Sequence, residues 1–192
     1  MKVRLTLSKK KILLLASILL LFLLALTLFQ RIKLPVYSWN YYGKNLKFRI
    51  NLRDAEKVPI YPSEIAVRKE ILNSFVENIT IVFKPGNETI NAHYAVEVFE
   101  ITYKLTLAYK LNFAYIPNFN VVNITSYENL KGTRENPIIA LVHPIYSNET
   151  SVKLENHVIY IKGENAKSSV EQLRNFDLAV TKFLMAALEI KI

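Results

Sequence analysis

A histidine, a serine and a glutamate lie close together in LVHPIYSNET, residues 141–150. His143, Ser147 and Glu149 are the residue types of a Ser/His/carboxylate hydrolase, in which the histidine takes a proton from the nucleophilic hydroxyl. The sequence contains no G-x-S-x-G nucleophile elbow. A histidine that ends a strand and bonds to backbone groups gives the same pattern. We favour that interpretation, so the three residues are catalytic candidates and not an assigned site.

The remaining residue types exclude several kinds of chemistry. Cysteine is absent, so a thiolate metal site, an iron–sulfur cluster and a thiol nucleophile are impossible. The 3 histidines, His93, His143 and His157, do not have the spacing of a zinc motif. The 4 glycines stand apart, so the sequence has no phosphate-binding loop or dinucleotide fingerprint. We therefore predict no metal, cofactor or nucleotide.

Two groups of carboxylates remain as candidates for acid–base chemistry. Glu97 and Glu100 could act as a pair, but Glu100 lies four residues before Lys104 and would bind it on a helix. We therefore expect a solvated helix face. Asp177 lies on the flank of an apolar stripe, where partial contact with water is the commoner outcome.

The elements that position these residues follow from the apolar spacing. Periods near two and near 3.6 residues predict strands and helices respectively. The expected strands are 45–52, 78–83, 119–124, 137–144 and 157–163. The expected helices run from a Ser63 cap to Asn73 or Ser74, over 91–112, and from a Ser168 or Ser169 cap towards the C-terminus. Residues 91–112 fit a strand as well as a helix, and we choose the helix.

Alternation of strands and helices predicts an α/β fold with a mostly parallel, mixed sheet. The run 137–144 is apolar throughout between two prolines, as in a central strand buried on both faces. His143 stands at its carboxyl end, where open α/β sheets bind ligands. Because of this position, we retain the His143 loop as a candidate site.

An apolar run near the N-terminus predicts a membrane anchor. Ile12–Phe29 is eighteen residues long, and Ser17 and Thr27 are its only polar members. A helix of that length reaches about 27 Å, close to the hydrocarbon thickness of a bilayer. A cleaved signal peptide is the alternative, but the run is long for one and lacks a clear small-residue cleavage site. We therefore expect a retained transmembrane helix.

The charge distribution predicts the orientation of this anchor. Five of the 25 Lys and Arg residues lie within residues 1–11, which leaves 20 against 16 Asp and Glu in the rest of the chain. No basic face remains for a nucleic acid, so we predict no nucleic-acid partner. The positive-inside tendency places the N-terminus in the cytoplasm. The predicted division is a cytoplasmic tail 1–11, a transmembrane helix 12–29, a juxtamembrane linker 30–44 and an extracytoplasmic α/β domain 45–192.

Two features agree with an extracellular domain. Four N-x-T sequons follow the predicted span, at Asn78, Asn87, Asn123 and Asn148, about twice the number expected by chance, and we predict glycosylation there. The aromatic segment YSWNYYG, residues 37–43, fits either an interfacial collar at the headgroups or residues packed at the domain entry.

Four segments carry a resemblance: NLRDAEKVPIYPSE, FEITYKL, NPIIALVHPIYSNETSV and FDLAVTKFLMAALEI. Together they resemble uncharacterised single-span envelope proteins of hyperthermophilic archaea. This resemblance implies a single-pass cell-membrane protein but no catalytic residue. We expect a non-catalytic accessory subunit that binds other envelope or membrane proteins. The alternatives are an extracytoplasmic hydrolase using the His143 loop and a tethered receptor for a solute or glycan.

Overall fold

The computed structural model describes residues 37–192. The predicted tail 1–11 and anchor Ile12–Phe29 lie outside this range. Within it, none of the helices has the length and apolar character that a bilayer crossing requires.

The described chain contains eight strands, four α-helices and one short 3-10 helix. The strands are β1 (Tyr37–Tyr41), β2 (Lys44–Phe48), β3 (Ile60–Tyr61), β4 (Asn78–Phe83), β5 (Asn118–Asn123), β6 (Ile138–Val142), β7 (Ser151–Glu155) and β8 (Val158–Lys162). The helices are α2 (Leu52–Glu56), α3 (Glu64–Ile71), α4 (Glu88–Phe113), η1 (Pro144–Tyr146) and α5 (Ser169–Leu188).

Six strands form one mixed sheet in the order β3-β7-β8-β6-β4-β5. All neighbours pair in parallel except β7 and β8, which pair antiparallel. The predicted α/β fold with a mostly parallel sheet is therefore confirmed. β6 lies between β8 and β4, and Ile139 to Val142 are buried, as expected for a central strand covered on both faces.

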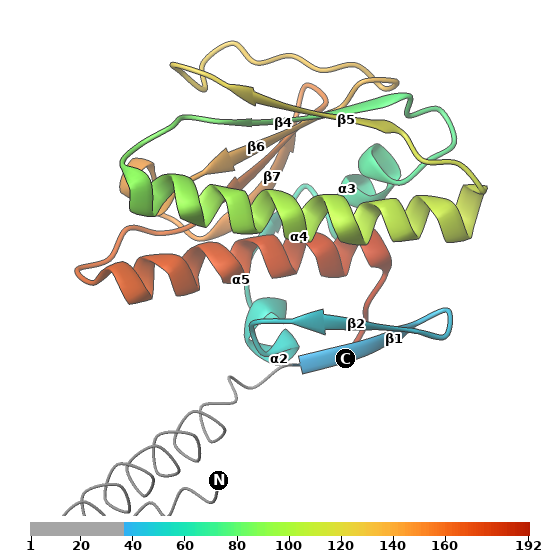
Figure 1. Ribbon diagram of the computed structural model, residues 1–192, viewed down its shortest axis with the longest axis horizontal. Coiled ribbons are helices and arrows are strands. Elements are labelled where there is room, and N and C mark those ends of the chain that lie inside the picture. The colour runs from blue at the N-terminus through green and yellow to red at the C-terminus, as the bar shows by residue number, and fades with distance from the viewer. Residues whose placement is uncertain (1–36) are drawn as a thin grey trace, which may run out of the picture. The chain divides into compact units, whose positions relative to one another are not determined.

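One face of the sheet is covered by helices and the other by a loop (Figure 1). α4 and α5 lie side by side along the helical face and run in the same direction, with α3 beside them. On the opposite face, Ile124, Tyr127 and Leu130 pack against a small cluster that includes Val82 and Ala140. The segment between β5 and β6 thus takes the place of a second helical layer.

A separate two-stranded hairpin, β1–β2, covers the outer side of α5 (Figure 1). Leu46 and Phe48 of β2 are buried in the same core as the inner residues of α5. α5 is consequently enclosed between the sheet and the hairpin, and all residues from Phe176 to Leu188 except Leu178 are buried. The main core of the domain lies around this helix.

Several predicted elements differ from the structure. The linker predicted over 30–44 is wrong beyond residue 36, because Tyr37–Tyr41 pairs with β2 and belongs to the folded domain. α2, β3 and β7 were predicted as loop, since each is short or carries many polar residues. The helix predicted over 91–112 is confirmed as α4, and the caps at Ser63 and Ser168 are confirmed by their bonds to Ala66 and Glu171.

Candidate functional site

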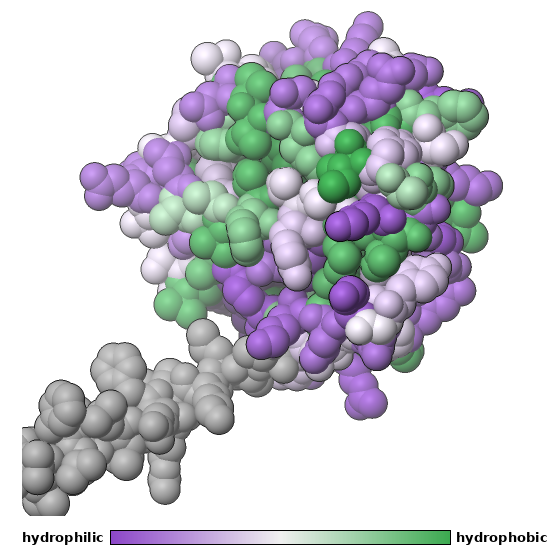
Figure 2. All heavy atoms as spheres, turned by 45° about the vertical axis from the view of Figure 1, so that its right-hand side comes forward, coloured by the Kyte–Doolittle hydropathy of each residue, from purple (hydrophilic) through white to green (hydrophobic). Residues whose placement is uncertain are grey.

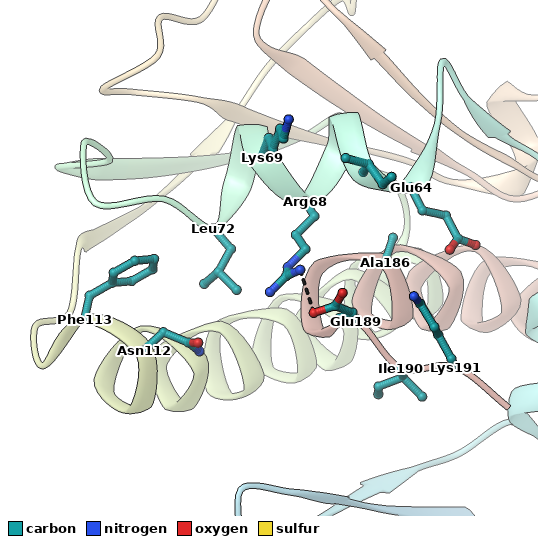
Figure 3. Close-up of a pocket in the computed structure, with 11 residues that line it drawn as sticks. Glu64, Arg68, Lys69, Leu72, Asn112, Phe113, Ala186, Glu189, Ile190 and Lys191 are labelled. Carbon is teal, nitrogen blue, oxygen red and sulfur yellow. Dashed lines mark ion pairs between the residues drawn. The ribbon is translucent and has the colours of Figure 1, made fainter.

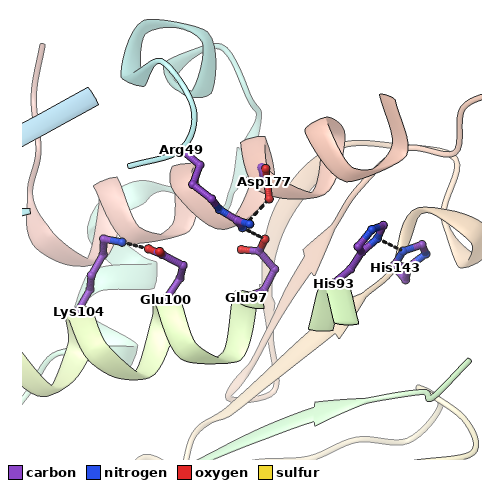
Figure 4. A network of polar contacts seen from close by, with 7 residues as sticks. All are labelled: Arg49, His93, Glu97, Glu100, Lys104, His143 and Asp177. Carbon is purple, nitrogen blue, oxygen red and sulfur yellow. Dashed lines mark hydrogen bonds and ion pairs between the residues drawn. The ribbon is translucent and has the colours of Figure 1, made fainter. Parts of the chain in front are cut away.

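The candidate site lies at the carboxyl ends of β4 and β6, next to the start of α4. Asn87 caps α4 immediately after β4, and His143 follows the last residue of β6. His93, in the second turn of α4, faces His143 across this end of the sheet, with 3.1 Å between Nδ1 of His93 and Nε2 of His143 (Figure 4). The sheet topology therefore assembles a histidine pair that the sequence did not predict.

Hydrogen bonding fixes the protons of this pair. The backbone N–H of Ile145 donates to Nδ1 of His143 at 3.4 Å, so the proton of neutral His143 resides on Nε2. Nε2 then donates to Nδ1 of His93, which leaves the His93 proton on its own Nε2. Burial lowers the pKa of His143 to about 4, and burial also lowers the pKa of His93. Both rings are therefore neutral at pH 7.

Two tyrosines anchor the backbone beneath the histidine pair. The His143 N–H donates to Oη of Tyr94 at 3.2 Å, and the Tyr94 hydroxyl lies 3.2 Å from that of Tyr127. Tyr127 in turn donates to the carbonyl of Leu141 at 2.6 Å. Burial raises the pKa of both tyrosines, so neither ionises near neutral pH. The network holds the end of β6 in place and offers no free hydroxyl.

The three catalytic candidates are not brought together. His143 bonds to His93 and to backbone, whereas the Ser147 hydroxyl donates to the carbonyl of its own loop neighbour Glu149 at 2.9 Å. The Glu149 carboxylate accepts from Lys162 Nζ at 2.9 Å, and this bond lowers its pKa. Ser147 and Glu149 line an open depression that does not include His143. The arrangement lacks the hydroxyl–imidazole–carboxylate contacts that a triad needs.

The third histidine lies apart from the pair. His157 Nδ1 contacts the Glu70 carboxylate at 2.9 Å on an exposed part of the surface. Across residues 37–192, no group of three or more His, Asp or Glu side chains could hold a metal ion. The two imidazoles of the pair could supply two ligands at most.

A second polar cluster lies buried between α4, α5 and the segment after β2 (Figure 4). Arg49 binds both Glu97 of α4 and Asp177 of α5, the latter at 2.7 Å. Burial raises the pKa of Glu97 well above its ordinary value, and the hydrogen bond and charge of Asp177 raise it further. The raised pKa favours the protonated form of Glu97, and the Arg49 guanidinium binds both carboxylates.

A neighbouring ion pair extends this cluster along α4. Lys104 binds Glu100 one turn earlier, and its ammonium lies 4.7 Å from the centre of the Phe48 ring. Burial lowers the pKa of Lys104 to about 8. The cavity beside the two carboxylates of the cluster is only about 10 Å³, too small for any substrate. The cluster joins the hairpin to the two helices.

The predicted solvent exposure of Glu97 and Asp177 is wrong. Glu97 is 1% exposed and Asp177 8% exposed, whereas a solvated face and a flank position were expected. Their cation, Arg49, lies 48 and 128 positions away in sequence, so local spacing could not reveal it. One signal in the sequence could have predicted the buried ion pair, namely the position of Asp177 beside a long apolar stripe. A carboxylate at that position needs a partner when another layer of the structure covers the helix.

The outer side of α4 has the opposite character. Val96, Phe99 and Tyr103 are 40%, 66% and 54% exposed, and the rings of Phe99 and Tyr103 stack with centroids 6.0 Å apart. Between residues 91 and 103 no charged side chain of α4 belongs to the exposed class. In this middle part α4 thus turns its charged residues inwards and an apolar stripe, Val96–Phe99–Tyr103, towards solvent, whereas Glu88 and Lys110 near its ends are exposed.

A cavity of about 250 Å³ opens where α3, α4 and α5 end (Figure 3). Leu72 and Phe113 lie on one side, Ala186 and Ile190 on the other, and an Arg68–Glu189 ion pair of 2.6 Å crosses between them. Figure 2 turns this end of the domain towards the viewer, and hydrophobic residues form several patches among hydrophilic ones. The open depressions beside β1 and in the loop after β6 are larger, about 380 and 400 Å³.

The four sequons differ in accessibility. Asn87, Asn123 and Asn148 are exposed. Asn78 is half-buried, and its amide nitrogen donates to Oδ1 of Asn136 at 2.6 Å. A glycan on Asn78 would have to break this bond, whereas the three exposed sequons can accept one without rearrangement.

Comparisons of the chain with protein-family models, with curated proteins and with solved structures find no match.

Proposed function

We propose that this chain is a single-pass membrane protein whose extracellular α/β domain is a non-catalytic accessory subunit, and that the stripe Val96–Phe99–Tyr103 binds an apolar helix of another membrane or envelope protein. The observation that carries the proposal is the exposed apolar stripe in the middle of α4. A solvated helix normally exposes its charged residues, yet Glu97 and Lys104 are buried here while Phe99 is exposed.

The spacing of the stripe favours a helical partner. Its residues follow each other by three and four positions, which places them on one face of α4. Such a face packs against the ridges of a second helix, and its lack of charge favours an apolar partner surface. The stripe also contains no sequon, so a glycan would not block it.

The two alternatives have less support. A hydrolase needs His143 beside a nucleophile, and Ser147 bonds elsewhere. A solute receptor in the expected form needs a closed apolar cavity of several hundred Å³. The cavity at the helix ends is about 250 Å³ and opens to solvent.

The decisive experiment is site-specific photo-crosslinking in the native membrane. A benzophenone amino acid replaces Phe99 in the tagged full-length chain, and the matched control replaces Phe75, an aromatic residue of 54% exposure in the loop between α3 and β4. We expect a protein crosslink at 99 and none at 75, and loss of the co-purified partner in Phe99→Glu. Equal crosslinking at both positions, or recovery of the chain alone in mild detergent, contradicts the proposal.

The topology has its own test. Protease added to intact cells should remove the domain, and mass spectrometry should find glycans on Asn123 and Asn148 more often than on Asn78, whose amide is engaged. A mature chain that begins near residue 30 and is released from the cell would contradict the anchor.

A further inference from the structure

The cavity at the ends of α3, α4 and α5 has charged walls whose acids are already neutralised. The carboxylate of Glu189 binds Arg68 at 2.6 Å, and Glu64 binds the buried Lys182 at 2.5 Å. Within the described part of the chain, the two other cations of the lining, Lys69 and Lys191, form no ion pair. The lining itself has three cations and two carboxylates, so the cavity has an excess of one positive charge and attracts an anion.

The inner surface of the cavity is apolar. Leu72, Ala186 and Ile190 are buried side chains, and Phe113 packs against the main core. An inorganic anion would gain nothing from these residues. A ligand with an anionic head and a hydrocarbon body would use both the lysines and the apolar surface.

An open depression lined with aromatic residues adjoins the cavity. It is lined by Trp39, Tyr41 and Tyr42 and shares Glu189 and Lys191 with the cavity. Tyr42 is 70% exposed. Rings with a polar edge favour the headgroup layer of a bilayer, so the continuous surface combines the residue types that bind lipid headgroups.

The position of this surface along the chain identifies the source of the ligand. β1 begins at Tyr37, and residues 30–36 are all that separate it from the end of the predicted anchor at Phe29. Seven residues span at most about 25 Å. We propose that the cavity and its adjoining depression bind an anionic lipid of the membrane in which the chain is anchored, an inference that rests on the proposed single-pass topology.

The test uses Trp39, the only tryptophan of the chain, as a reporter. Full-length protein is placed in phosphatidylcholine nanodiscs that contain zero, one-tenth or three-tenths phosphatidylglycerol. We expect the emission of Trp39 to change with the fraction of phosphatidylglycerol and not with added inorganic phosphate. The Lys69→Gln and Lys191→Gln variants should each weaken the response about fivefold, and the double variant about 30-fold.

Lys131→Gln/Lys167→Gln is the matched double control. It removes the same charge from two exposed lysines, one in the loop over the opposite face of the sheet and one before the first turn of α5. Lys69 also lies in the last turn of α3, where a cation stabilises the helix end, so melting temperatures are measured in parallel. A lysine that only stabilised α3 would lower the melting temperature and leave the Trp39 response intact.

The outcomes separate the two proposals. A chain that fails to co-elute with the discs contradicts the membrane anchor and, with it, the lipid site. A chain that co-elutes with the discs, but whose Trp39 emission does not change with the fraction of phosphatidylglycerol, contradicts the lipid site alone. The lipid site is also overturned if inorganic phosphate produces the same response, or if the control double variant weakens it as much as Lys69→Gln/Lys191→Gln.

Discussion

α4 and α5 lie side by side on the same face of the sheet, yet only α5 is covered on its outer side. The β1–β2 hairpin buries α5 with Leu46 and Phe48, whereas Phe99 and Tyr103 of α4 face solvent. The inner sides of the two helices are alike, because each buries two charged residues, Glu97 and Lys104 on α4 and Asp177 and Lys182 on α5. The difference supports the proposal that a partner covers the outer face of α4, as the hairpin covers that of α5.

Two matched phenylalanines give the strongest test of the difference between the covered helix α5 and the uncovered helix α4. Phe48→Ala, in the cover of α5, should reduce the free energy of unfolding by about 3–5 kcal/mol, because it leaves a cavity in the core. Phe99→Ala, on the uncovered face of α4, should change it by less than about 0.5 kcal/mol. Urea denaturation of both variants measures the difference. Similar losses would mean that Phe99 already has a structural role within the domain.

The pH dependence of stability tests the histidine pair that His143 forms with His93 of α4. His143 has a folded pKa of about 4 against an ordinary 6.5, so the unfolded chain binds more protons between these values. Its contribution to stability is complete above pH 6.5 and is lost as the pH falls to 4, by about 3 kcal/mol. His143→Asn, which keeps an acceptor for the Ile145 N–H, should flatten this slope in denaturation series. An unchanged slope would place the titration elsewhere.

Removal of a cation tests the buried cluster that joins the hairpin to both helices. Arg49→Met leaves Asp177 buried without its partner and should destabilise the domain by about 2–3 kcal/mol, less than a fully buried pair because Arg49 is partly exposed. Arg53→Met, on the exposed side of α2, is the control and should have almost no effect. Equal effects of both variants would mean that general charge, and not this contact, matters.

Local sequence patterns were sufficient for most of the sheet and for the long helices. The run Asn78–Phe83 and the caps at Ser63 and Ser168 are determined by neighbouring residues, and the structure confirms them. β7 was missed because Ser151–Glu155 is short and carries two charged residues. A strand of this kind is recognisable only from its pairing with β8, which the sequence does not display.

Local sequence patterns could not predict the two polar clusters either, because the residues in each cluster are far apart in the sequence. His93 and His143 are 50 positions apart, and Arg49 and Asp177 are 128 apart, so only the tertiary fold brings each pair together. The alternation that made 91–112 ambiguous has the same origin. α4 has apolar residues on its outer side as well as on its buried side, where Ile101, Leu105 and Ala108 join the core, and this weakens the usual helical contrast between core and solvent.

The smallest expected effect concerns Glu97 itself. Because its pKa is raised, the folded chain holds a proton on Glu97 that the unfolded chain releases above about pH 4.3, so stability falls as the pH rises towards the folded pKa. Glu97→Gln replaces a protonated carboxyl by an amide of the same shape, and it should change stability at pH 5 by less than about 1 kcal/mol. Above the folded pKa of Glu97 the variant should become the more stable protein. If Glu97→Gln instead costs as much as Arg49→Met at pH 5, then Glu97 is ionised and Arg49 binds two charged carboxylates.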